Sequence, residues 1–274
     1  MNFYKENQSY YNRNASVYEN SSWYYFNKYK NNEVYKEINK CLSLIDKDTI
    51  RILEIGPGTG YLMSKLNEDS YKKINYLGVE HSEEMSRILI KQFEDKFEKF
   101  VIINQSIGKD FIENRLRDYK FDLIIGSSIL HHLPDYDLVI HGLFQLLDES
   151  GIMYFVREPI AENDCQKGDM VNNIFSKIYG QISDWYLKPI IRSVLWPQKV
   201  KQESQEKIAI HMFNAGVSFL PFRDLLQKNE LIFYRKYNRR ASSFFSYMEN
   251  KWLKLTRKDI FRNTLFSISI RKKP

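Results

Sequence analysis

The chain has 274 residues, of which 43 % are hydrophobic and 27 % charged, with 41 Lys and Arg against 34 Asp and Glu for a formal charge of +7. These proportions are typical of a globular chain and exclude a disordered or collagen-like one. No apolar run reaches the roughly 18 residues that a membrane-spanning helix needs.

The N-terminal part of the chain predicts helices and no signal peptide, because it lacks both a basic and an apolar signal region. Residues 1–30 are rich in Tyr and Asn with a spacing that indicates short helices, and residues 33–45 place apolar side chains on one side of a helix. The two cysteines, Cys41 and Cys165, form no CxxC pair or disulfide framework, which indicates a reducing, cytoplasmic location.

The next part of the chain alternates short apolar strands with helices. A strand at 50–55 ends in a Gly-rich turn at 56–60, and a helix is expected from about 61 to 66. Ser82 is expected to cap a helix that continues to about Lys96. Further strands are expected at 74–80, 100–104, 121–126, 152–156, 231–234 and 265–270, with a helix at 138–147 and a turn at 149–151. Such alternation is typical of a doubly wound α/β fold with a parallel sheet.

The Gly-rich turn predicts a nucleoside site. It contains Gly56, Gly58 and Gly60, and the carboxylate of Glu80 follows 20 residues later at the end of the next strand. Glycines let the backbone approach a ligand, and an acid in that place can accept both ribose hydroxyls. A dinucleotide site would favour a different glycine spacing and a pyrophosphate, whereas the neighbouring acid Glu54 suits a cationic ligand. This comparison favours S-adenosylmethionine.

Four stretches of the chain resemble motifs of the class I S-adenosylmethionine-dependent methyltransferases. The Tyr-rich segment 10–18 is similar to the N-terminal segment of the small-molecule branch of that family, which includes the ubiquinone and menaquinone methyltransferases. The stretches are 52–60, 80–85, 121–133 and 146–152 with 158–159. The resemblance implies a Rossmann-like seven-stranded sheet with an antiparallel last strand. The resemblance covers about residues 8–160, is only topological for 216–274 and is absent for 160–215, where helical apolar spacing and large aromatic residues interrupt the alternation. We therefore expect an N-terminal helical segment at 1–45 over the cofactor, a core at 46–159, a helical lid insertion at 160–215 and a return to the core sheet at 216–274.

The resemblance also implies which residues meet the cofactor. The glycines would line it, Glu80 would hold the ribose, and Gln105 and Ser106 would meet the adenine. Met85 would pack on the adenine face or only on the core. The remaining expected cofactor residues are Glu54, His81, Ser127 and Tyr18.

His131 and His132 are the candidates for acid–base chemistry. They follow the strand at 121–126, at the carboxyl edge of the sheet, where ligands bind in such folds. A base helps an oxygen or nitrogen nucleophile to lose its proton. The family pattern favours His131 as the residue that faces the pocket, and Tyr11 could pair with a histidine or close over the cofactor. The structural alternative is that both histidines pack against the next helix.

The acceptor would meet Glu158, His211 and Trp185. Glu158 follows the fifth strand and could bind a cationic acceptor or form an ion pair, and the other two belong to the insertion. The aromatic residues of the insertion could cover an apolar acceptor, rest on a membrane surface, or form a helical pair packed on the sheet.

The sequence therefore predicts an enzyme that transfers a methyl group to an oxygen or nitrogen of a small biosynthetic molecule without a metal ion. No His and Cys spacing suggests zinc. The positive charge is compatible with an RNA or peptide acceptor, although no appended binding segment supports nucleic acid, and it can also be purely compositional. A cofactor-binding protein without catalysis is the third possibility.

Overall fold

The computed structural model describes residues 3–18, 28–66, 73–161, 216–238 and 264–274. The strands are β1 (Thr49–Ile55), β2 (Lys73–Val79), β3 (Lys99–Ile103), β4 (Phe121–Ser127), β5 (Leu147–Pro159), β6 (Glu230–Asn238) and β7 (Thr264–Arg271). The α-helices are α1 (Phe3–Tyr18), α3 (Lys28–Ser43), α4 (Met63–Leu66), α5 (Glu83–Phe93), α6 (Lys109–Phe111), α7 (Tyr136–Gln145) and α11 (Leu220–Leu226).

The seven strands form one sheet in the order β3-β2-β1-β4-β5-β7-β6. The pairs among β1 to β5 are parallel, whereas β7 runs antiparallel to both β5 and β6. The predicted α/β class and the antiparallel last strand are confirmed. The predicted lid lies outside the described residues.

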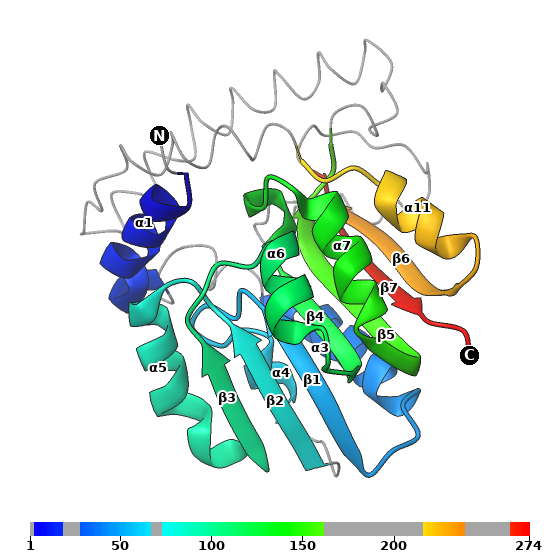
Figure 1. The fold of residues 1–274 in the computed structure, drawn as a ribbon, viewed down its shortest axis with the longest axis horizontal. Coiled ribbons are helices and arrows are strands. Elements are labelled where there is room, and N and C mark those ends of the chain that lie inside the picture. Colours follow the sequence, from blue (N-terminus) through cyan, green and yellow to red (C-terminus); the bar gives the residue numbers. More distant parts are fainter. Residues whose placement is uncertain (1–2, 19–27, 67–72, 162–215, 239–263) are drawn as a thin grey trace.

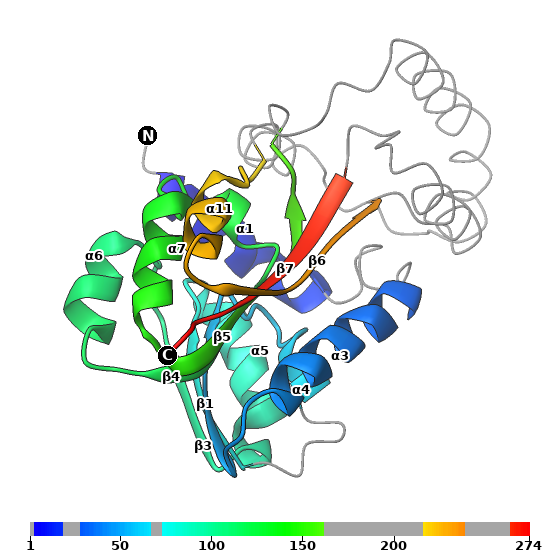
Figure 2. The same ribbon diagram turned by 90° about the vertical axis from the view of Figure 1, so that its right-hand side faces the viewer.

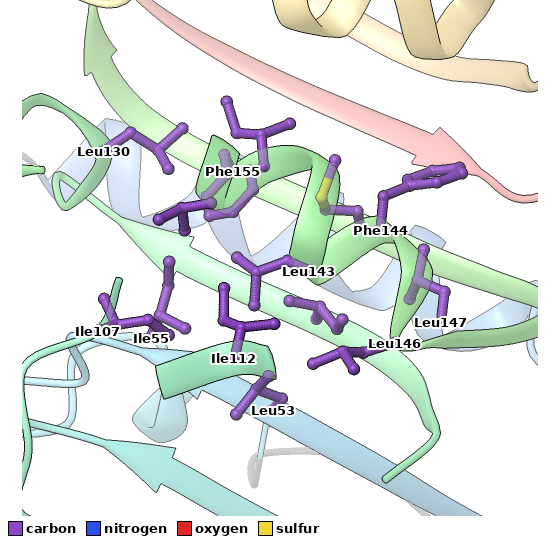
Figure 3. Close-up of a cluster of buried hydrophobic side chains, with 14 of the residues drawn as sticks. Leu53, Ile55, Ile107, Ile112, Leu130, Leu143, Phe144, Leu146, Leu147 and Phe155 are labelled. Atoms are coloured by element: carbon purple, nitrogen blue, oxygen red, sulfur yellow. The ribbon is translucent and has the colours of Figure 1, made fainter. Parts of the chain in front are cut away.

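Helices cover both faces of the sheet. Figure 2 shows α6, α7 and α11 on one face and α3, α4 and α5 on the other. The first face buries a continuous apolar cluster between α7 and strands β1, β4 and β5, to which Leu53, Ile55, Leu143 and Phe155 belong (Figure 3). A second cluster, which includes Ile38 of α3, fills the opposite face. Burial on both faces explains why the central strands are almost wholly apolar.

Local capping sets where α5 begins. The backbone N–H of Met85 donates to the Ser82 hydroxyl at 3.2 Å, and Glu83 and Glu84 stand in the first turn. An oxygen acceptor and negative charge at this end both stabilise a helix. The predicted cap is confirmed. The α-helix ends at Phe93, and a 3₁₀ turn, Glu94–Lys96, completes the expected length.

Four ionic side chains join the strands at the amino edge of the sheet. Arg51 donates to Asp122 and to Asp148, and Lys47 pairs with the same two acids. The hydrogen bonds from Lys47 and Arg51 lower the pKa of Asp148 to about 2. This cluster holds β1, β4 and the start of β5 in register at the edge opposite the glycine turn.

Three predictions about local structure were wrong. Residues 3–18 form one helix, α1, where short helices were expected. The expected turn at 149–151 lies within β5, which begins at Leu147 and contains Ser150 at φ 61. A helical stretch that was not expected, α6 followed by the π-helical turn Ile112–Leu116, connects β3 to β4. It buries Ile112 and Leu116 beneath α7.

Candidate functional site

A pocket lies at the carboxyl edge of the parallel strands, beneath α1. Figure 1 shows α1 above the ends of β2 and β3, away from the amino edge. Ligands of open α/β sheets bind at this edge. The lining residues are Asn7, Tyr11, Tyr18, Gly56, Gly58, Val79, Glu80, His81, Met85, Gln105, Ser106, Ile107, Ser127, Ser128, Ile129, His132 and Leu133.

Backbone amides fix the Glu80 carboxylate in the lining of this pocket. Gly58 N–H donates to its Oε2 at 2.9 Å, and Ser82 N–H donates to its Oε1 at 2.9 Å. The Nδ1 atom of His81 lies 3.2 Å from the same Oε1. A carboxylate offers about four lone-pair sites, so these contacts leave acceptor capacity for a ligand hydroxyl.

The glycine turn has two different functions. Gly58 has φ +58, and the nearest atom to an added Cβ would be the Met85 sulfur at 3.8 Å, on the pocket side. Gly60 has φ +102, and an added Cβ would lie 2.4 Å from Phe93 of α5. Gly56 and Gly58 line the pocket, whereas Gly60 permits close packing between the turn and α5.

Glu54 lies outside the pocket lining, in contrast to the expectation that it faces the ligand. Its side chain is buried, and Tyr76 donates its hydroxyl to Glu54 Oε2 at 2.7 Å. Burial raises the pKa of Glu54 to about 8, with a further upward contribution from the Glu80 charge. The carboxyl is therefore protonated at neutral pH, which removes the charge on which the expected contact with a cation depended.

The structure places His132 in the pocket wall, where the family pattern favoured His131. His132 lines the pocket, whereas His131 is buried behind it and its Nδ1 lies 2.9 Å from Glu158 Oε2. Glu158 also accepts the backbone N–H groups of Ile129, Leu130 and His131 at 2.8, 3.1 and 3.3 Å. Glu158 is fully buried and does not line the pocket, and its contact with His131 agrees with the expected alternative of an ion pair. Its carboxylate holds the turn that presents His132.

Tyr11 reaches His132 from α1. Its hydroxyl lies 3.2 Å from His132 Nε2, and its ring makes edge contacts with His132, His81 and Tyr18. Burial lowers the pKa of His132 well below its ordinary value, with added repulsion from His131 and His81. Burial likewise raises the pKa of Tyr11. At neutral pH the pair is thus a neutral phenol on a neutral imidazole.

Helix α1 is tied to the start of α5. Ser82 donates its hydroxyl to Asn12 Oδ1 at 2.7 Å, and Gln8 donates to the His81 carbonyl at 2.7 Å. These contacts place Asn7, Tyr11 and Tyr18 over the pocket. Asn7 was not predicted, although its spacing of four residues from Tyr11 puts both side chains on one helix face.

Three buried atoms of the lining have no hydrogen-bond partner among the described residues: Asn7 Oδ1, His81 Nε2 and His132 Nδ1. Buried polar atoms are normally paired, so these atoms indicate places where a ligand completes the site. The other lining residues that the sequence did not indicate are Val79, Ile107, Ser128, Ile129 and Leu133.

The remaining predicted residues divide into two groups. Met85, Gln105, Ser106 and Ser127 line the pocket, and Trp185 and His211 lie outside the described residues. Within the described ranges no group of three or more His, Cys, Asp or Glu side chains could hold a metal ion. No described helix is long and apolar enough to span a membrane.

Comparisons with known proteins identify the chain's relatives. Residues 26–186, more than half of the chain, match the family described as methyltransferase domain. A malonyl-[acyl-carrier protein] O-methyltransferase of Bacillus cereus is 31 % identical over 107 residues, which are 39 % of this chain and 37 % of that protein. An uncharacterised methyltransferase of Bacillus velezensis is 32 % identical over 103 residues, which are 37 % of this chain and 44 % of that protein. The matched segment thus spans less than half of either curated relative.

Solved structures show the same fold. The magnesium protoporphyrin IX methyltransferase from Synechocystis PCC 6803 with bound SAM has a TM-score of 0.53 at 10 % identity, covering 100 % of this chain and 98 % of that one. The DhpI–SAH complex has a TM-score of 0.50 at 13 % identity, covering 99 % and 98 %. At these identities the likeness concerns the fold alone.

Proposed function

The chain belongs to the methyltransferase-domain family, and from this membership we propose that its pocket binds S-adenosylmethionine and directs the methyl group to a small-molecule acceptor. The resemblance to class I enzymes and the choice of cofactor agree with the family match. The acceptor, the methylated oxygen or nitrogen, and the roles of individual residues are proposals.

The Glu80 carboxylate is the observation that carries the proposal. It stands at the end of β2, anchored by the N–H groups of Gly58 and Ser82, with acceptor capacity directed into the pocket. A ribose supplies hydroxyl donors that fit this carboxylate. Gln105 and Ser106, which follow β3, are suited to the edge of an adenine, and Met85 to its face.

The unpartnered atoms support the same cofactor. Asn7 Oδ1 is a hydrogen-bond acceptor, and a ligand with ammonium, amino and hydroxyl groups would supply donors. The neutral state of Glu54 agrees with this assignment, because Glu80 then carries the negative charge that faces the pocket. When bound, S-adenosylmethionine supplies a sulfonium methyl group for in-line displacement by the acceptor.

The chain's own contribution to transfer is to align the acceptor and exclude water. Helix α1 covers the pocket with Tyr11 and Tyr18. His132 replaces His131 as the proposed acceptor-facing residue, because its Nδ1 has no partner among the described residues while Tyr11 occupies its Nε2. Glu158 and His131 would act as positioning residues for the turn that carries His132.

A transfer assay tests the acceptor class. The full chain would be incubated with methyl-labelled S-adenosylmethionine and an ultrafiltered metabolite extract, or with total RNA or peptide fractions in separate arms. The proposal predicts label in the small-molecule arm that survives nuclease and protease. Label confined to RNA or peptide would refute the small-molecule acceptor, and cofactor binding without transfer in any arm would favour a non-catalytic binding protein.

A further inference from the structure

Arg157 is a buried cation that has no assigned role in the proposed site. The residue is 6 % exposed, and none of the ion pairs among the described residues includes it. Its Nη2 atom is buried without a hydrogen-bond partner there. Arginine stays protonated in proteins, and a buried charge is costly unless an opposite charge pairs with it.

The acid next to Arg157 in the sequence does not pair with its guanidinium. Glu158 follows Arg157 directly, but its two oxygens accept three backbone N–H groups and contact His131 Nδ1. The guanidinium instead lies over the Tyr61 ring, 4.3 Å from its centroid. A ring face attracts a cation, yet it gives Nη2 no hydrogen-bond acceptor.

The position of Arg157 connects it to the pocket. Its backbone has φ 64, and the lining residue Ser128 has φ 53; both lie in the left-handed region that L residues rarely adopt. The Ser128 hydroxyl donates to the Arg157 carbonyl at 3.2 Å, and Ser128 N–H donates to the Val156 carbonyl at 3.0 Å. Such conformations concentrate at functional sites, where the surrounding structure holds them.

The charge of Arg157 also acts on a lining residue. Burial raises the pKa of Tyr18, and the Arg157 charge opposes that rise. Tyr18 lies in the pocket wall, so the guanidinium is within electrostatic reach of whatever binds beside it.

We propose that Arg157 provides the subsite for a carboxylate, and that the methyl acceptor is therefore an organic acid whose carboxylate pairs with the guanidinium next to the pocket wall at Tyr18. This inference rests on the proposed function and adds the substrate class to it. The planar fork of arginine matches a carboxylate with two parallel hydrogen bonds. The cofactor's own carboxylate shares this chemistry, and the experiment separates the two sources.

The test compares the full-length wild type with Arg157→Met, Arg157→Lys and the control Arg235→Met. Arg235 pairs with Glu33 and Glu37, and none of these three residues lines the pocket. Each protein, saturated with S-adenosylhomocysteine, is titrated with acetate, malonate and benzoate and with the matching neutral amides, and binding is followed by ligand-observed NMR. Calorimetry with S-adenosylhomocysteine and with methylthioadenosine, which lacks the amino-acid end, forms the second arm. Thermal unfolding shows which variants are folded.

We expect at least one acid to bind the wild type about tenfold more tightly than its amide, the scale of one charge-assisted hydrogen bond. Arg157→Met should remove this preference, Arg157→Lys should restore part of it, and Arg235→Met should keep it. Cofactor affinity should stay the same in all four proteins.

Two results would overturn the inference about the acceptor. If Arg157→Met weakens S-adenosylhomocysteine but not methylthioadenosine, the carboxylate belongs to the cofactor. If no acid is preferred to its amide by the wild type, or if the preference survives in Arg157→Met, the subsite does not exist. Failure of the wild type to bind either nucleoside would instead refute the proposed function, whatever the acids do.

Discussion

Replacement of Glu80 by Gln tests the contact on which the cofactor assignment depends, together with one backbone anchor, because the amide nitrogen cannot accept from Gly58 or Ser82 N–H. Three of the roughly four acceptor positions of the carboxylate are occupied by Gly58 N–H, Ser82 N–H and His81 Nδ1. The remaining capacity gives a ligand hydroxyl one full hydrogen bond to a charged acceptor, worth about 1.5–3 kcal/mol. The loss of that bond corresponds to a roughly 10- to 150-fold weaker Kd for S-adenosylhomocysteine.

Glu54→Gln is the matched control for this prediction. Both carboxyl groups are buried near the glycine turn, but Glu54 bonds to Tyr76 and lies outside the pocket lining. Since Glu54 is protonated at neutral pH, its amide should leave the Kd within about threefold, less than one hydrogen bond would change it. Calorimetry at pH 7 measures both affinities, with thermal unfolding to check the fold. Equal losses in the two variants, or none in Glu80→Gln, would refute the reasoning.

Four further predictions concern other residues. His132→Ala should reduce transfer with little change in cofactor Kd, and equal loss of transfer in a folded His131→Gln would contradict the assignment of His132 to the pocket. Glu158→Ala should leave three backbone donors and the His131 ring without their acceptor, and should lower the free energy of unfolding by about 3 kcal/mol or more. A loss below about 1 kcal/mol in urea unfolding would count against the anchoring role of Glu158. Gly60→Ala should destabilise the chain by about 1–3 kcal/mol through contact with Phe93, whereas Gly58→Ala should mainly weaken cofactor binding. A larger loss of unfolding free energy in Gly58→Ala, together with a larger loss of cofactor affinity in Gly60→Ala, would show that the two glycines have other functions. Folded Glu54 keeps a proton that the unfolded chain releases, so its contribution to stability should fall as pH rises from 4.5 to about 8, whereas the lowered pKa of His132 contributes a rise below its ordinary value of 6.5. The difference in unfolding free energy between the wild type and Glu54→Gln isolates the Glu54 contribution and should decrease over this range, and a difference that does not change with pH would refute the raised pKa.

The sequence was informative where local pattern determines structure. The apolar runs at β1, β2 and β4 predicted their strands, and the position of Glu80 after β2 predicted its place at the carboxyl edge. Ser82 followed by two acids predicted the start of α5. Each of these features depends on neighbouring residues and on the alternation of strand and helix.

The sequence was misleading where distant residues decide the outcome. His131 and His132 are adjacent, and only Glu158, 27 residues after His131, determines which ring is buried. Glu54 resembles a ligand-facing acid in the sequence, but in the fold Tyr76 on the neighbouring strand donates a hydrogen bond to its carboxyl oxygen. The unpaired state of Arg157 could not be predicted, because it depends on which acids are already occupied elsewhere in the fold.

A crystal structure of the chain with S-adenosylhomocysteine tests the central claim most directly. We expect a ribose hydroxyl on the Glu80 carboxylate, the adenine beside Gln105 and Ser106, and the sulfur on the side of Tyr11 and His132. A ligand bound elsewhere, a ribose away from Glu80, or a sulfur separated from His132 by the pocket wall would contradict the account.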